Sequence, residues 1–349
     1  MQSQPTPTRH PTRVRGMAAV AAATALAAAG CATPGSAPDA GEVTITTPFD
    51  SCLSWYPLYV ADENGYFEDE GIDAQLQGTD SSGGAVQAVL SGQAQLASTA
   101  PDAYLSSAAS GADIQAFYAL YQRSSFQLIA PQGSGIEELS DVAGHTVGIS
   151  NPGGGDVVYS EWLLASQAGL EAGEDYEQLA VGNGSSAATA LSDGSIDAHS
   201  AAFFHEEVIR EGELDMDVVA GEDTPDVVGN LLVADDTWVA ENGDTVDSVG
   251  RALARATEWG MENAEGVVDL CGRHAPEEVQ DRAFAETIHG RVSGLLELPE
   301  SADGQYGHID TDAFTVYAEE LAELGLVESA EGAQDVHNDH VGAWNTDGS

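Results

Sequence analysis

The chain contains no lysine: its ten basic residues are all arginine, against 58 aspartates and glutamates, and its formal net charge is −48. Without a lysine side chain it cannot form the Schiff base that many covalent enzymes use. So acidic a surface repels nucleic acids and anionic lipid head groups, and we expect neither as a partner. Salt would screen the self-repulsion of this surface, which fits a saline habitat or simply an acidic secreted protein.

Familiar catalytic patterns are also missing. The sequence has no Gly-x-Ser-x-Gly elbow, and the spacing of its three cysteines reveals no Cys-His-Asn arrangement. His337 and His340, with Asp339 between them, could hold a transition metal, but they lie in a polar tail that we interpret as a solvated chain end. We therefore expect no enzymatic activity, no cofactor and no metal site.

Long apolar runs are scarce, and the one at residues 17–29 is too short to cross a bilayer. It follows three arginines and leads into Ala28-Ala29-Gly30-Cys31, which resembles a lipoprotein cleavage site. We predict a signal peptide at residues 1–30, lipidation of Cys31 and a flexible tether at 31–41 that is rich in Pro, Gly and Ser. The alternative is an ordinary secretory signal that happens to include a cysteine.

Strand-like and helix-like segments alternate after the tether, which predicts an α/β protein with parallel sheets. The first set comprises strands at 43–47, 72–76, 95–98 and 114–120, with helices at 84–90 and 102–110. The second comprises strands at 126–130, 146–149, 179–181 and 196–199, with helices at 157–167 and 187–191. After a return near 228–233 the sequence is mostly helical, notably at 251–263, 276–289 and 312–326. We predict one lobe from 42–123 and 231–349, and a second from 124–230.

Short sequence motifs, most of them in the first lobe, resemble those of a known family. These motifs are Trp55-Tyr56-Pro57, Tyr59-Val60-Ala61, Gly65-Tyr66-Phe67 and Glu70-Gly71-Ile72-Asp73. The segments 91–97, 111–114 and 139–148 resemble the same family. Over residues 43 to 235 the chain resembles the SsuA/ThiY-like solute-binding proteins of ABC importers. The resemblance implies a type II periplasmic-binding-protein fold, in which two α/β lobes close on a ligand about a hinge. The class also includes eukaryotic thiamine-pyrimidine synthases, but these use a lysine-bound pyridoxal phosphate.

Loops that follow strands are the candidate binding site, because ligands of open α/β sheets sit beyond the carboxyl ends of the strands. The first loop offers Asp50 together with Trp55 and Tyr56. The rings of Trp55 and Tyr56 suit a planar heterocycle, and the alternative is that Trp55 is a core residue. The second offers the hydroxyls of Ser98 and Thr99 just before a helix start.

The third candidate loop contains Asn151, Gly154 and Gly155, where glycines allow backbone to approach a ligand. It lacks the Lys and Ser/Thr of a P-loop, and a plain flexible turn is the alternative. In the fourth, Phe203 could form an aromatic sandwich with Trp55 when a ligand lies between the lobes. His205 could bond a ring nitrogen or merely cap a helix at the surface.

Together these features predict a monomeric extracytoplasmic lipoprotein, anchored to the outer face of the membrane, that passes a small organic solute to an ABC permease and its ATPase. Arg123 is the only cation near the predicted cleft, whereas Asp50, Asp102 and Asp156 lie on its loops. A nitrogen heterocycle such as a thiamine pyrimidine precursor therefore suits the site. The alternatives are a sulfonate, taurine or nitrate binder of the same fold, or a sensor lipoprotein without a permease.

Two cysteines remain beyond Cys31. Cys52 and Cys271 both fall in the first predicted lobe, and the signal places them outside the cytosol, where a disulfide between them can persist. Otherwise both are small buried residues.

Overall fold

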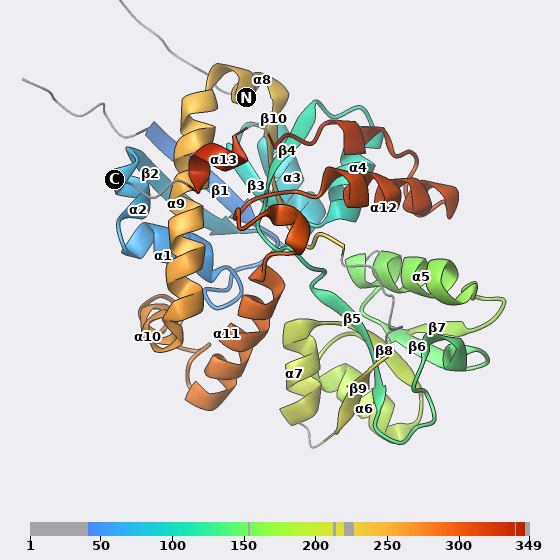
Figure 1. Cartoon of the computed structure of the whole chain (residues 1–349). Coiled ribbons are helices and arrows are strands. Elements are labelled where there is room, and N and C mark those ends of the chain that lie inside the picture. Colours follow the sequence, from blue (N-terminus) through green and yellow to red (C-terminus); the bar gives the residue numbers. More distant parts are fainter. Residues whose placement is uncertain (1–40, 153, 212–213, 220–226, 339, 346–349) are drawn as a thin grey trace, which may run out of the picture. The chain divides into compact units, whose positions relative to one another are not determined.

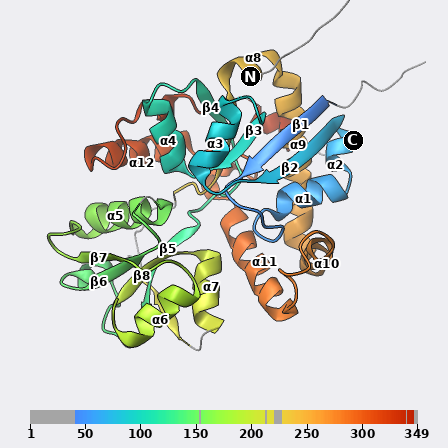
Figure 2. The same cartoon turned by 180° about the vertical axis from the view of Figure 1, so that it is seen from behind.

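The computed structural model describes residues 41–152, 154–211, 214–219, 227–338 and 340–345 (Figures 1 and 2). All of them belong to one structural unit that begins at residue 38. The predicted signal peptide, Cys31, the tether up to residue 40 and Asp339 lie outside the described residues. Within these ranges, no helix has both the length and the apolar character that crossing a membrane would need.

The first sheet has five strands in the order β2-β1-β3-β10-β4. Their bounds are β1 Gly41–Thr47, β2 Ile72–Gly78, β3 Leu96–Thr99, β4 Ile114–Ala119 and β10 Leu231–Asp235. β1 pairs in parallel with β2 and β3, but β10 runs antiparallel to both β3 and β4. The predicted parallel pairing holds for β1, β2 and β3 but not for β10, because the chain re-enters this sheet from the opposite end after building the second one.

The second sheet has the order β7-β6-β8-β5-β9. Its strands are β5 Phe126–Pro131, β6 Thr146–Ile149, β7 Glu177–Ala180, β8 Ala198–Ala202 and β9 Met216–Val218. β6 is parallel to β7 and β8, whereas β5, the strand by which the chain enters, is antiparallel to β8 and β9. Two mixed α/β sheets with flanking helices thus confirm the predicted fold class.

Helices connect the strands of each sheet. Those of the first sheet are α1 Tyr56–Glu63, α2 Tyr66–Asp69, α3 Ser82–Leu90 and α4 Pro101–Ala109. Those of the second are η1 Leu139–Val142, α5 Gly155–Ala168, α6 Ser185–Asp193 and α7 Phe203–Glu211. After β10 follow α8 Asp236–Glu241, α9 Gly243–Glu262, α10 Ala264–His274, α11 Arg282–Leu296, η2 Glu300–Ala302, α12 Thr311–Glu323, η3 Glu331–Gln334 and α13 Val341–Trp344. The C-terminal part is mostly helical, as predicted.

One C-terminal helix is displaced from its predicted position. The sequence pattern predicts a helix over 276–289, whereas α11 begins at Arg282 and continues to Leu296. Asp281 explains the later start, because its carboxylate accepts a hydrogen bond from the Phe284 backbone N–H (3.1 Å) and caps the helix there.

The loop before α1 is held by hydrogen bonds and by the disulfide that the sequence suggested. Asp50, a predicted ligand-binding residue, accepts a hydrogen bond from the backbone N–H of Gly78 at the end of β2 (2.7 Å). α1 starts at Tyr56 with a proline in its first turn, where the missing N–H costs nothing. A disulfide joins Cys52 to Cys271 of α10, and the Glu278 carboxylate accepts the N–H groups of Cys52 and Leu53 (3.2 and 2.9 Å).

Two chain segments cross between the sheets side by side. The N–H groups of Leu120 and Tyr121 both donate to the Asn230 carbonyl (2.8 and 3.1 Å), and the Gly229 N–H donates to the Tyr121 carbonyl (3.0 Å). A Cβ atom at Gly229 would lie 2.1 Å from the Arg123 carbonyl oxygen, so only glycine lets the segments approach this closely. The lobe boundaries near 123 and 230 stay predictions.

Candidate ligand-binding site

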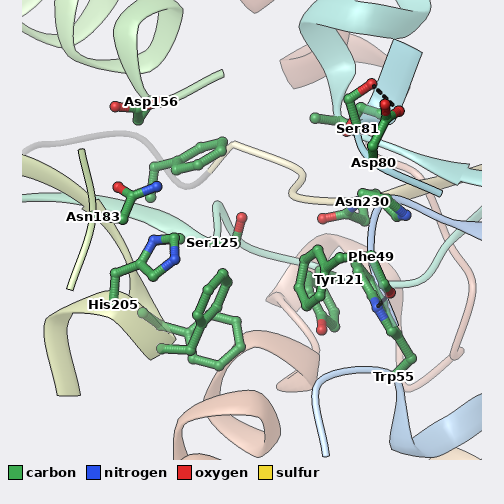
Figure 3. Close-up of a pocket in the computed structure, with 17 residues that line it drawn as sticks. Phe49, Trp55, Asp80, Ser81, Tyr121, Ser125, Asp156, Asn183, His205 and Asn230 are labelled. Carbon is green, nitrogen blue, oxygen red and sulfur yellow. Dashed lines mark hydrogen bonds between the residues drawn. The ribbon is translucent and has the colours of Figure 1, made fainter. Parts of the chain in front are cut away.

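A cavity of about 410 Å³ is lined by loops of both sheets (Figure 3). Most of its residues follow the carboxyl ends of parallel strands, namely Pro48, Phe49, Asp80, Ser81, Ser82, Ala100, Tyr121, Asn183, Phe203, Phe204 and His205. Ser125, Phe126 and Asn230 come instead from the amino ends of β5 and β10. β10 in the first sheet and β5 in the second are each antiparallel to their neighbours. The amino end of each strand therefore lies at the edge where the carboxyl ends of the parallel strands of its sheet lie.

Aromatic rings form one wall in an unbroken series of contacts. Tyr121 stacks on Trp55 with centroids 5.3 Å apart and an interplanar angle of 11°. Trp55 meets Phe49 at 5.2 Å, Phe49 meets Phe204 at 5.1 Å, and Phe204 meets His205 at 4.0 Å. The series runs from the loop after β1 to the start of α7, so it links elements of the two sheets.

These contacts bear on the predicted aromatic sandwich of Trp55 and Phe203. Phe49 and Phe204 already connect the Trp55 ring with the Phe203 region, and Phe203 packs edge-on against Phe204 (5.3 Å). The expectation that these regions meet only around a ligand is therefore wrong. Trp55 is only 2% exposed, and its indole N–H donates to the Phe49 carbonyl (2.9 Å). Trp55 is thus a core residue that also forms part of the cavity wall.

Polar groups occupy the remaining walls, with Asp80 and Ser81 on one side and Asp156, Asn183 and His205 on the other (Figure 3). The turn after β2 is shaped by Ser81, whose hydroxyl accepts the Gly84 N–H (3.0 Å) and caps α3. A carboxylate therefore stands on each side of the cavity.

The starts of α4 and α5 carry their own acids. Asp156 lies in the first turn of α5 and is 4% exposed, and its carboxylate accepts the Ser150 N–H (2.8 Å) and hydroxyl. Asp102 lies in the first turn of α4, where burial, reinforced by the charge of Asp156, raises its pKa. A helix start is where an anionic ligand would find free N–H groups, but here side-chain carboxyls occupy both positions.

His205 is neutral at physiological pH. Burial, with a smaller contribution from the nearby His199, lowers its pKa to about 4. A neutral imidazole offers one N–H donor and one nitrogen acceptor, which complements a ring that has both kinds of group.

The described arginines pair with carboxylates and do not line the cavity. All seven described arginines make ion pairs with carboxylates: Arg123 with Glu297, Arg210 and Arg291 with Glu206, Arg251 with Glu70, Arg255 with Asp69, Arg273 with Glu63, and Arg282 with Asp269. None of the seven is among the residues that line the cavity. Arg123, the cation expected at the cleft edge, lies 3.1 Å from the Glu297 carboxylate instead.

A family model described as "NMT1/THI5 like" matches residues 54–266, more than half of the chain. The chain belongs to this family. No curated protein sequence matches it.

Solved structures similar to this NMT1/THI5-like chain share its fold. A Bordetella bronchiseptica RB50 protein has 23% identity and a TM-score of 0.64, covering 87% of this chain and 96% of its own. The periplasmic aliphatic sulphonate binding protein SsuA from Escherichia coli has 16% identity and a TM-score of 0.68, with coverage of 86% and 92%. The periplasmic nitrate-binding protein NrtA from Synechocystis PCC 6803 has 15% identity and a TM-score of 0.61, with coverage of 87% and 88%. The predicted SsuA/ThiY-like resemblance is confirmed.

The cavity of this family member brings together three of the ten predicted ligand-binding residues: Trp55, Phe203 and His205. Tyr56 is fully buried instead, stacking on His289 (5.0 Å) with its hydroxyl 3.1 Å from that of Ser293. Its ring presses on α9, where a Cβ at Gly260 would come within 2.3 Å of it. Helix packing, not a ligand, therefore explains the residue type at position 56.

The other six predicted residues are not part of the cavity lining. Asp50 is exposed and accepts a hydrogen bond from Gly78, the last residue of β2. Ser98 and Thr99 are buried within the first sheet, and Asn151 is exposed. A Cβ at Gly154 would lie 2.1 Å from the Asp156 carboxylate, and one at Gly155 would lie 3.1 Å from the Phe126 ring. The two glycines thus make room for neighbouring side chains, and a role in binding for these six stays a prediction.

Several residues that line the cavity were not predicted from the sequence. Asp80 follows a predicted strand, so the rule that selected the other loops would have found it. Tyr121 and Asn230 lie on the crossing segments and carried no motif. Among the described residues, no group of three or more His, Cys, Asp or Glu side chains could hold a metal ion.

Proposed function

We propose that this protein is the extracytoplasmic solute-binding component of an ABC importer and that it captures a small nitrogen heterocycle, such as a thiamine pyrimidine precursor. The observation that carries the ligand class is the cavity lining: an aromatic wall, a neutral histidine, two carboxylates, and neither arginine nor lysine. A cavity of about 410 Å³ suits a small organic molecule.

The lining complements such a heterocycle group by group. The half-buried Phe49 and Phe204 rings offer apolar faces to a planar ring. Ring or exocyclic N–H donors can bond to the carboxylates of Asp80 and Asp156, and a ring nitrogen can accept a hydrogen bond from His205. One side of the ring would thus contact elements of the first sheet and the other side elements of the second.

Transport is supported by the similar structures, two of which are periplasmic binding proteins for a sulphonate and for nitrate. A sulfonate, taurine or nitrate ligand is the alternative within this fold. The carboxyls at the starts of α4 and α5 and the paired arginines weigh against an anion. The second alternative is a sensor lipoprotein that serves no permease, and genes for a permease and an ATPase beside this one would decide against it.

The proposed mechanism is closure and not catalysis. The lobes 42–123 with 231–349 and 124–230 would close about the two crossing segments and enclose the solute. The protein would act as a monomer, held at the outer face of the membrane by lipid on Cys31. Since the chain has no lysine, the Schiff-base chemistry of the related pyrimidine synthases is not available to it.

A thermal-shift screen tests the ligand class. The panel contains aminopyrimidines, riboflavin, polyamines, taurine, alkanesulfonates and nitrate. A ligand that binds only the folded state at a concentration of 100 times its Kd stabilises the protein by about 2.7 kcal/mol, so aminopyrimidines should raise the Tm. If only sulfonates or nitrate raise the Tm, the heterocycle proposal is refuted. If none of the compounds raises the Tm, the result counts against the binding function itself.

Phe204→Ala tests the cavity. The ring lies in the cavity wall and is half-buried, so its loss should weaken binding of the best heterocycle about tenfold, because an aromatic pair contributes about 0.5–1.5 kcal/mol beyond its buried area. Phe284→Ala is the matched control, since Phe284 is also half-buried but lies on α11 outside the lining. Equal Kd values for the two variants, measured by calorimetry, would show that the ligand binds elsewhere.

A further inference from the structure

A buried carboxylate lies directly behind the cavity wall. Glu206 on α7 is 0% exposed, and its Oε1 accepts hydrogen bonds from Arg210 Nε (3.0 Å) and Nη2 (2.6 Å) of the same helix. Its Oε2 accepts a hydrogen bond from Arg291, which belongs to α11. A fully buried carboxylate is tolerated only when such partners surround it.

Arg291 contacts three second-sheet residues at once. Its Nη2 donates to the Gln127 amide oxygen on β5 (2.7 Å) as well as to Glu206, and its Nε lies 3.4 Å from the Glu207 carboxylate. The planar guanidinium group presents several donors in fixed directions, which allows this multiple contact. Both views of the fold show α7 beside α11 (Figures 1 and 2).

The helix that carries Arg291, α11, is held against helices α1 and α9, which belong with the first sheet. On α11, His289 lies 2.9 Å from the Gly260 carbonyl of α9 and stacks on Tyr56 of α1. The Ser293 hydroxyl meets that of Tyr56 at 3.1 Å. Arg291 therefore projects from a helix packed on α1 and α9 and reaches across to α7 and β5.

The connection ends next to the ligand-binding surface. Glu206 immediately follows Phe203, Phe204 and His205, all of which line the cavity. A displacement of α7 would therefore move these three side chains together. Without Arg291, the remaining arginine on Glu206 would be Arg210, which lies on α7 itself and cannot link it to α11.

We propose that the Arg291–Glu206 pair is a latch that holds α7, and with it the Phe203–His205 wall of the cavity, in position against the first-sheet elements. Both are positioning residues, because neither lines the cavity. The effect of the latch on affinity rests on the proposed binding function, whereas its effect on α7 does not. If the latch keeps the protein in a binding-competent arrangement, its loss weakens binding in proportion to the population of that arrangement that is lost.

Hydrogen exchange in the ligand-free full-length protein tests the latch directly. Arg291→Gln should speed exchange of the amides in residues 198–211 about tenfold, because α7 loses its tie to α11. The matched control is Arg282→Gln, which removes an arginine from the same helix whose partners, Asp269 and Glu286, lie away from the cavity. A purely structural role would speed exchange throughout the chain, α12 included. Such a uniform increase, or wild-type exchange in 198–211, would overturn the proposal.

Arg291→Lys provides a variant that keeps the positive charge. A single ammonium group cannot reproduce the fork of contacts to Glu206, Glu207 and Gln127, so a smaller local increase in exchange is expected. This variant also replaces Arg291→Gln if the latter does not fold. Exchange equal to the wild type in residues 198–211 would then contradict the latch.

Ligand affinity separates the latch from the proposed function. With an aminopyrimidine that stabilises the wild type, Arg291→Gln should raise Kd about tenfold, and Arg282→Gln should leave it unchanged. An unchanged Kd in Arg291→Gln would contradict the link between latch and affinity. If no compound in the panel binds the wild type, the proposed function fails, while the exchange experiment still decides whether α7 is latched.

Discussion

At the scale of single residues, burial determines the chemistry of the site more than residue type does. Histidine has its ordinary pKa near neutrality, yet burial lowers the pKa of His205 to about 4. Trp55 likewise looks like a ligand-facing aromatic in the sequence, but it is 2% exposed and stacked on Tyr121. Removing Trp55 would therefore cost stability as well as affinity, and Phe204 is the better residue for a test of binding.

The depressed pKa of His205 predicts a dependence of stability on pH. Between pH 6.5 and about 4 the unfolded chain binds a proton at this histidine and the folded protein does not, so the free energy of unfolding falls as the pH falls. His205 contributes up to about 3 kcal/mol to this fall.

Urea unfolding of wild type and His205→Asn at pH 7 and pH 4.5 measures the effect. The difference in unfolding free energy between the two pH values should be smaller in the variant, because asparagine does not titrate. Equal differences would show that His205 is protonated as easily in the folded as in the unfolded state.

At the scale of elements, tight backbone packing holds the two crossing segments together. Gly229→Ala would place a Cβ 2.1 Å from the Arg123 carbonyl oxygen and 2.8 Å from the Tyr121 Cβ, so the backbone would have to move. Overpacking of this kind costs about 1–3 kcal/mol, and we expect a corresponding loss of stability.

Gly243→Ala is the control for that substitution. Gly243 begins α9, and a Cβ there would meet nothing within 4 Å. Alanine is the better helix former, and nothing obstructs its side chain here, so this variant should be at least as stable as the wild type. Chemical denaturation compares the two, and a Gly229→Ala variant as stable as Gly243→Ala would mean that the crossing segments separate easily.

At the scale of the whole molecule, location depends on residues outside the described structure. If Cys31 carries lipid, the protein should sediment with membranes, and Cys31→Ser should appear in the soluble extracytoplasmic fraction or the medium. Fractionation followed by immunoblotting measures the distribution. Equal membrane retention of wild type and variant would contradict lipid anchoring at Cys31.

Sequence patterns predicted only part of the fold of the whole molecule. Alternating strand and helix signals located strands of both sheets, because apolar and β-branched runs reflect local burial. They did not reveal that β5 and β10 are antiparallel, since strand direction depends on where the chain enters a sheet. The helix α7 was missed except for its aromatic start, because its nine residues are too few for a clear helical period.

The sequence by itself determined the α/β class, the SsuA/ThiY-like resemblance, the absence of lysine chemistry and three lining residues, Trp55, Phe203 and His205. Only the tertiary structure decided which other side chains join them. Tyr56 follows Trp55 directly, yet it packs on α9, whereas Asn230 reaches the cavity from a distant part of the chain. The physical reason is that residue type and local pattern record burial, while a binding site is made by the relative placement of loops that long-range packing brings together.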